Sequence, residues 1–187
     1  MATRKGVYRI ENGVALIELR LSRIAQLFNS LDPSPFHQKD LDHDAEEYIF
    51  GAAREIGPAT PFKIVIHLPR SEMADAQATK EAIQNYFGYR LDTTQRDLRY
   101  ELHLGRIALL IGLGFLFACV VAREFVQRLG KTTLVDLLAE GLLISGWVAM
   151  WRPLNIFLYD WWPIRRNVRV FQRLAQADVE LRAEPGG

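Results

Sequence analysis

The feature that most constrains this chain is an uncharged apolar run from Ile107 to Ala122. As a helix that rises 1.5 Å per residue, the run covers about 24 Å, slightly less than the roughly 30 Å hydrocarbon core of a bilayer. Arg106 and Arg123 flank it, and their alkyl stems can carry both charges to the interface. A chain of 187 residues is too small to surround a helix that is apolar on every face. The run therefore predicts a transmembrane helix within residues 104–128, and the alternative is a buried helix of a soluble protein.

A second apolar run, from Leu134 to Trp151, is long enough to cross the bilayer again. It predicts a transmembrane helix within residues 134–152. A short external loop, residues 129–133, would join the two helices, so that they form a transmembrane hairpin.

Two acidic residues, Asp136 and Glu140, lie one turn apart near the start of this second run. An acidic residue at mid-bilayer costs about 2.5–3.5 kcal/mol on insertion scales, so we expect both at the interface, facing Arg128 or Lys131. The alternative is a small transport or channel subunit, in which Glu140 from several copies forms an acidic ring that attracts cations.

Basic residues near the two runs predict the orientation of the hairpin. Eight arginines lie on the outer sides of the two runs, whereas three basic residues lie between them: Arg90, Arg96, Arg99, Arg106, Arg152, Arg165, Arg166 and Arg169 against Arg123, Arg128 and Lys131. Because cytoplasmic segments carry the excess of arginine and lysine, we expect a cell-membrane protein with both termini in the cytoplasm. The predicted lipid-interface residues are Arg106, Trp151, Arg152, Trp161, Trp162, Arg165 and Arg166.

Small residues recur every four positions in both runs, and such ridges let helices approach closely in lipid. They are Gly114, Ala118 and Ala122 in the first run and Gly141, Ser145 and Ala149 in the second. We expect these ridges to pack the hairpin on itself or on another copy of the chain, as a homo-oligomer or part of a larger membrane complex.

Residues 1–103 predict a small cytoplasmic α+β domain, with a β-hairpin, a helix, a strand and a helix in that order. Asn12-Gly13 favours a type I′ turn between two short apolar strands. Asp42 or Asp44 can cap a helix that ends at Ile56, and Phe62 to Leu68 predicts a strand. A helical tract follows, with a possible bend between Gly88 and Thr93.

Residues 153–187 predict an interfacial or cytoplasmic tail with an amphipathic helix. From Trp161 to Leu181, apolar residues recur at helical spacing, with arginines on the other faces. Two arrangements remain open, since this basic helix could rest on anionic lipid or pack on the cytoplasmic domain.

Chemical motifs are few. The acidic segment around His37 to Glu47 offers Asp40, Asp42, His43 and Asp44 as weak metal ligands, but it lacks the glycine and the glutamate of an EF-hand loop. We therefore expect no metal and no cofactor, and a membrane-anchored enzyme or metal-binding domain around His37–Glu47 is the second alternative, after the transport or channel subunit. The net charge of +1 gives no basic excess for nucleic acid, and the start of the chain has no signal-peptide pattern.

These features together favour a non-enzymatic two-pass membrane protein. Its cytoplasmic α+β domain would act as an interaction, regulatory or assembly module, with the lipid bilayer and other protein copies as partners.

Overall fold

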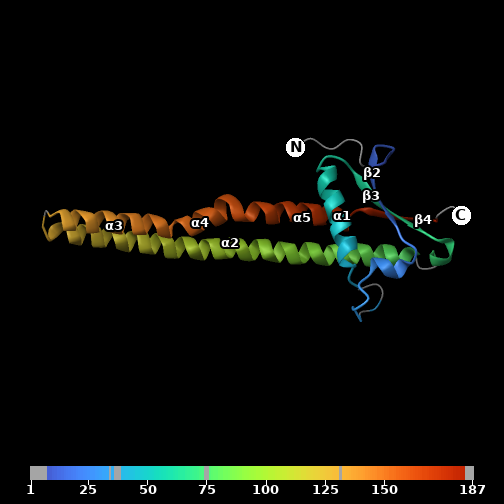
Figure 1. Ribbon diagram of the computed structural model, residues 1–187, viewed down its shortest axis with the longest axis horizontal. Helices are drawn as coiled ribbons and strands as arrows, with labels where there is room; N and C mark the ends of the chain where they lie inside the picture. Colours follow the sequence, from blue (N-terminus) through green and yellow to red (C-terminus); the bar gives the residue numbers. More distant parts are fainter. Residues whose placement is uncertain (1–7, 34, 36–38, 74–75, 131, 184–187) are drawn as a thin grey trace. The chain divides into compact units, whose positions relative to one another are not determined.

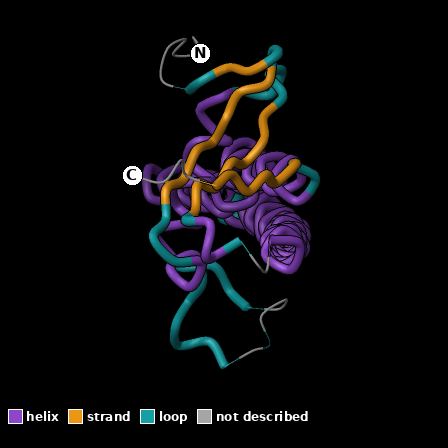
Figure 2. Tube along the Cα trace, turned by 90° about the vertical axis from the view of Figure 1, so that its right-hand side faces the viewer, coloured by secondary structure: helices purple, strands orange, loops and turns teal. Residues whose placement is uncertain are grey.

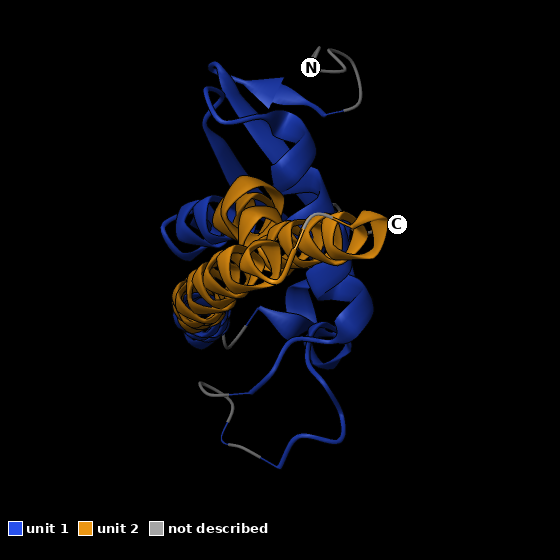
Figure 3. Ribbon diagram, turned by 90° about the vertical axis from the view of Figure 1, so that its left-hand side faces the viewer, with its two compact units in different colours: residues 1–93, 167–187 blue, residues 94–166 orange. Residues whose placement is uncertain are grey.

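The computed structural model describes residues 8–33, 35, 39–73, 76–130 and 132–183. The chain divides into two compact units (Figure 3). Unit 1 consists of residues 1–93 and 167–187, and unit 2 consists of residues 94–166. Unit 1 is therefore assembled from two segments that lie on either side of unit 2 in the sequence.

Unit 1 contains a four-stranded sheet in the order β1 (Ile10–Glu11), β2 (Val14–Arg20), β3 (Phe62–Leu68) and β4 (Asp178–Ala183) (Figure 2). The β1–β2 pair is antiparallel, whereas β2–β3 and β3–β4 are parallel. Asn12 and Gly13 have φ angles of 51° and 79°, so the predicted type I′ hairpin is confirmed. The predicted strand from Phe62 to Leu68 is also confirmed.

Three helices contribute to the core of unit 1. They are α1 (His43–Ile56), the beginning of α2 (Ala76–Arg128) and the end of α5 (Trp161–Ala175). Asp42 caps α1, since its carboxylate accepts a hydrogen bond from the Asp44 amide at 3.0 Å. Short 3₁₀ turns form at Ile24–Leu27 and Arg70–Glu72.

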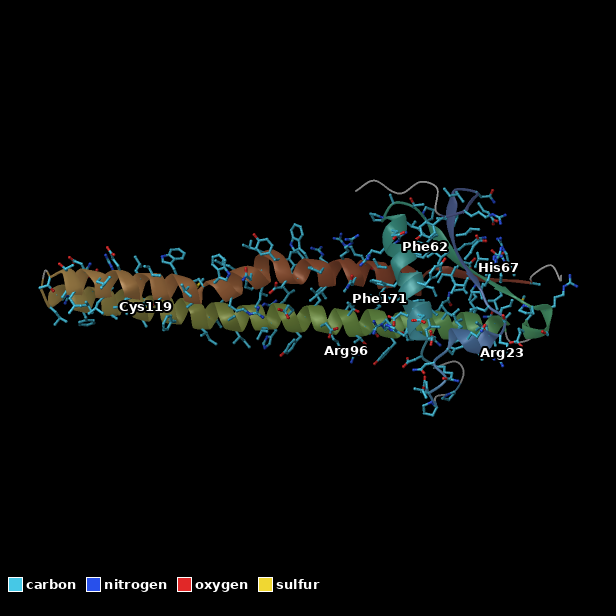
Figure 4. All side chains as sticks on the ribbon, viewed as in Figure 1. Arg23, Phe62, His67, Arg96, Cys119 and Phe171 are labelled. Atoms are coloured by element: carbon cyan, nitrogen blue, oxygen red, sulfur yellow. The ribbon has the colours of Figure 1, made fainter. Side chains whose placement is uncertain are left out.

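Alternation along the strands directs one face of the sheet into this core. The buried core side chains include Ile17, Ile49, Ile64, Ile66, Ile83, Phe87, Phe171 and Leu174. Phe171 of α5 lies 4.7 Å from Phe50 of α1 and 6.5 Å from Phe87 of α2, measured between ring centroids (Figure 4 labels Phe171). The three helices therefore meet around one aromatic ring.

The C-terminal segment differs from the predicted tail. The amphipathic helix ends at Ala175, and residues Asp178–Ala183 form β4, with Ile64 of β3 opposite Val179. A helix as far as Leu181 was therefore wrong. Two arrangements were left open for this helix, on anionic lipid or on the domain. Its last turns pack on the domain, because Val170, Phe171 and Leu174 lie in the core of unit 1.

Two helical stretches, Ala76–Arg128 and Thr133–Ala175, are long and apolar enough to cross a membrane. The second comprises α3 (Thr133–Ala149), α4 (Trp151–Asn155), the π-helical turn η4 (Ile156–Asp160) and α5 (Figure 1). Helix α2 continues without interruption through Gly88 and Thr93, so the region of the predicted bend does not divide it.

Candidate functional site: the apolar helices and their polar ends

The apolar helices of unit 2 contact each other along positions that repeat every seven residues. Within unit 2 the buried positions of α2 are Gly105, Gly112 and Cys119. Those of the returning stretch are Ala139, Gly146 and Pro153, which repeat every seven residues, and Ile156, which lies three residues after Pro153. The seven-residue positions are the ones that concern the contact here. Figure 4 labels Cys119 on α2. A seven-residue repeat keeps two antiparallel helices in contact with a slight left-handed twist, as in a coiled coil. These six residues are called the seam below.

Three seam glycines are places where the helices approach most closely. A Cβ atom added to Gly105 would lie 2.7 Å from Ile156 Cγ2, and one added to Gly146 would lie 2.7 Å from Leu116 Cδ1 and 3.3 Å from Cys119 Cβ. A Cβ on Gly112 would lie 3.1 Å from the carbonyl oxygen of Ala149. Glycine therefore lets the backbone of the other helix approach Gly112 and Gly146, and leaves room for the Ile156 side chain at Gly105. Small residues allow such close approach of helices in lipid.

The contact at Gly112 has a further chemical reason. Pro153 has no N–H, so it cannot donate the usual helical hydrogen bond to the carbonyl of Ala149, four residues earlier. The same carbonyl faces the Cα of Gly112, where a weak Cα–H···O contact can form. The seam thus brings a polarised C–H group to a carbonyl that has lost its ordinary donor.

The predicted small-residue ridges lie mostly outside the seam. Nothing lies within 4 Å of a Cβ added to Gly114 or Gly141, and Ala118 and Ser145 are exposed. Ala122 and Ala149 are half-buried. Gly114 and Gly141 therefore do not pack α2 against α3, and packing on another copy stays a prediction. The sequence did contain the signal for the seam, because Gly105, Gly112 and Cys119 are spaced by seven.

The acidic pair lies toward the end of the seam that is nearest the connecting loop. Extending the antiparallel register from the Gly112–Ala149 contact places Glu140 level with the last turn of the run 107–122 and Asp136 beyond it. Both acids are exposed, and neither forms an ion pair with another described residue. Arg128 stacks on Phe125 instead, with its guanidinium carbon 5.8 Å from the ring centre, and Lys131 lies outside the described residues.

The other end of unit 2 is basic and aromatic. The predicted lipid-interface residues Arg106, Trp151, Arg152, Trp162, Arg165 and Arg166 are exposed, and Trp161 is half-buried. Arg152 lies 3.7 Å from Asp160. The antiparallel register of the Gly112–Ala149 contact places Arg152 level with Leu109, inside the first apolar run. The Arg152 side chain extends along its own helix toward Asp160, at the polar end.

Unit 1 contains a polar cluster between α1 and α2 that the sequence analysis missed. The Tyr86 hydroxyl donates to Glu46 Oε2 at 2.6 Å, and Arg90 Nε lies 2.7 Å from Glu46 Oε1. Burial, together with the hydrogen bond to Glu46, raises the pKa of Tyr86 above its usual range. A cavity of about 310 Å³ adjoins the cluster and is lined by Asp40, Asn85, Tyr86 and Tyr89.

The weak metal candidates are not gathered into a site. Asp42 caps α1, His43 is the exposed first residue of that helix, and Asp44 is exposed. Among the described residues, no group of three histidine, cysteine, aspartate or glutamate side chains could hold a metal ion. His37 lies outside the described residues.

A charged network covers the sheet face that points away from the helices. Lys63 Nζ lies 2.6 Å from Glu180, and Arg182 donates to Glu11 and Glu180, at 2.7 Å in each case. Val65, on the same face by alternation, is fully buried. The network lowers the pKa of Glu180 to about 2, first through the hydrogen bond from Arg182 and then through that from Lys63.

Comparison of the chain with models of protein families, with curated proteins and with solved structures gave no match. The function therefore has to be argued from the geometry described above.

Proposed function

We propose that this chain is a non-enzymatic two-pass membrane protein whose cytoplasmic unit 1 acts as an interaction, regulatory or assembly module. The observation that carries the proposal is the return of the chain to the same sheet. Strand β4 pairs with β3, although both apolar helical stretches lie between the two strands in the sequence.

This return limits the number of membrane crossings. The beginning of α2 and the end of α5 both contribute buried side chains, such as Phe87 and Phe171, to the core of unit 1. A chain that leaves one side of a bilayer and returns to the same folded unit crosses an even number of times. Two apolar stretches therefore imply two crossings that form a transmembrane hairpin.

Lipid is the environment that suits the outer surface of these helices. Several large apolar side chains of unit 2 are more than 60% exposed: Leu110, Ile111, Phe117, Leu137, Ile144, Trp147 and Trp151. Contiguous apolar surface of this kind is unfavourable in water and marks a membrane or protein contact. Helical backbone groups hydrogen-bond to one another, as the bilayer requires, and the Ala149 carbonyl that Pro153 leaves without a donor faces Gly112.

The orientation follows from charge and aromatic residues. Arg106, Arg165 and Arg166 lie toward the unit 1 end of the hairpin along the chain, and Trp161 and Trp162 accompany them. By the positive-inside rule this end faces the cytoplasm, and tryptophan rings at the headgroup level are consistent with that assignment. Both ends of the chain are then cytoplasmic, and residues 129–133 are external.

An assembly role is supported by the faces that the seam leaves free. Gly114, Ala118, Gly141 and Ser145 point away from the intramolecular contact and can accept the helices of another copy or of a partner. Unit 1 would then act on the cytoplasmic side of a homo-oligomer or of a larger membrane complex.

Two steps test the proposal. Membranes that contain the full-length protein are first washed with alkaline carbonate, and we expect the protein to stay in the pellet. The protein is then purified in mild detergent, and its mass is measured by light scattering. A stable oligomer or complex supports the assembly role, whereas release by carbonate, or a monodisperse monomer without partners, contradicts the proposal.

A further inference from the structure

Residues 161–166, which connect the apolar stretch to the core of unit 1, form a compact basic and aromatic surface. The indole N–H of Trp161 donates to the carbonyl of Phe157 at 2.7 Å, which fixes the ring against the π-helical turn. Trp162 packs edge-on against Trp161, with ring centres 6.0 Å apart, and Arg165 lies 5.3 Å over the Trp161 ring. These side chains are therefore held close together.

The positive charge of this surface has no acidic partner among the residues that the structure describes. Arg165 and Arg166 are exposed, and neither forms an ion pair with a described acidic residue. Asp160, the nearest acid in the sequence, pairs with Arg152 instead. Arg173, farther along α5, donates its hydrogen bonds to the carbonyls of Gly57 and Thr60 and so adds nothing here.

We propose that Arg165 and Arg166, together with Trp161 and Trp162, bind the headgroup phosphate of an anionic phospholipid in the cytoplasmic leaflet. The inference rests on the proposed function, because only a membrane-spanning chain presents these residues at the headgroup level. A guanidinium offers paired N–H donors to phosphate oxygens, and the indole rings occupy the boundary between headgroup and acyl chain. A zwitterionic lipid carries its own cation, so these arginines favour a lipid with net negative charge.

The experiment uses full-length protein in detergent, freed of bound lipid. Phosphatidylglycerol or phosphatidylcholine is titrated in, and the bound lipid is measured by native mass spectrometry. We expect phosphatidylglycerol to bind more tightly, and the double variant Arg165→Gln/Arg166→Gln to lose about fivefold in affinity for each arginine, roughly 30-fold in all. Arg54→Gln, an equal change at an exposed arginine of α1, should leave the affinity unchanged.

Three outcomes would overturn the inference. They are equal affinity for the two lipids, a preference that survives in the double variant, and equally strong binding of water-soluble glycerol phosphate. The carbonate wash separates these from failure of the proposed function. If the parent protein leaves the membrane, the two-pass assignment is wrong; if it stays but shows no lipid preference, only the lipid site is wrong.

Discussion

At the scale of single residues, Arg173 joins α5 to the loop before β3. Its guanidinium donates to the carbonyls of Gly57 at 2.8 Å and Thr60 at 2.6 Å. It also lies 4.6 Å over the ring of Phe62, and burial lowers its pKa. Unit 1 is built from residues 1–93 and 167–187, and a side chain of the second segment therefore satisfies backbone carbonyls of the first.

We predict that Arg173→Ala lowers the free energy of unfolding of unit 1 by about 2–3 kcal/mol, because two carbonyls lose a charged donor and the ring contact is lost. Hydrogen exchange of core amides in detergent-solubilised protein measures this change. Arg169→Gln, at an exposed position of the same helix, should change it by less than about 0.5 kcal/mol. Equal effects of the two substitutions would contradict the role given to Arg173.

Glu180 makes the stability of unit 1 sensitive to acid. Its pKa is about 2 in the folded chain, against an ordinary value of 4.5, so the folded state binds fewer protons than the unfolded state. The stabilisation is present above pH 4.5 and is lost as the pH falls toward 2. Because 37% of the side chain is exposed, solvent screening keeps the effect modest.

We predict that Glu180→Gln destabilises unit 1 at pH 7 and makes the loss of stability between pH 4.5 and 2 less steep. Chemical unfolding at several pH values, followed by hydrogen exchange of the core amides of unit 1, measures both effects. Glu47→Gln, at an exposed position of α1, is the matched control and should retain the parent acid dependence. An unchanged acid slope in Glu180→Gln would rule out this assignment.

At the scale of elements, the seam sets how α2 and α3 pair. Gly146 lies against Leu116 and Cys119, and a Cβ atom added to Gly146 would lie 3.3 Å from the Cβ of Cys119. Disulfides form when two Cβ atoms lie about 3.5–4.5 Å apart, so a small adjustment suffices here. The single native cysteine therefore reports directly on the pairing.

We predict that Gly146→Cys forms an intramolecular disulfide with Cys119 under mild oxidation, seen as a mobility shift that reductant reverses. Gly141→Cys on the same helix has nothing within 4 Å and should form no intramolecular bond. The seam would be refuted if the second variant crosslinked within the chain and the first did not.

The sequence predicted elements whose signals are local. Asn12-Gly13 and the Asp42 cap each act within a few residues, and the structure has both. The seam was missed because its seven-residue spacing of Gly105, Gly112 and Cys119 lies among other small residues, such as Gly114 and Ala118, which gave an equally regular spacing of four. Strand β4 was missed because its alternation of apolar and polar residues is short and depends mainly on Val179 and Leu181. Leu181 also continued the helical spacing of α5.

At the scale of the whole chain, β4 completes a sheet whose other strands come before both apolar stretches. Val179 is 3% exposed and lies opposite Ile64 of β3. The core of unit 1 therefore cannot be finished until the chain has passed through unit 2 and returned. Folding of unit 1 thus depends on residues at the far end of the sequence.

We predict that Val179→Asp unfolds unit 1, because a buried unpaired carboxylate costs several kcal/mol, while the apolar helices stay in the membrane. Limited trypsin digestion of inside-out membrane vesicles should cut unit 1 rapidly, and carbonate should still leave the helices in the pellet. Ala183→Asp, at the exposed end of the same strand, should keep the parent digestion pattern. Resistance of Val179→Asp to trypsin would contradict the part given to β4.

The central claim is that the chain crosses the bilayer twice and leaves unit 1 on the cytoplasmic side. Single cysteines in a Cys119→Ala background test it, with Leu129→Cys in the predicted external loop and Glu47→Cys in α1, both exposed positions. A membrane-impermeant maleimide should label Leu129→Cys in intact cells, and Glu47→Cys only after the membrane is permeabilised. Labelling of Glu47→Cys in intact cells, or protection of Leu129→Cys until permeabilisation, would contradict the account.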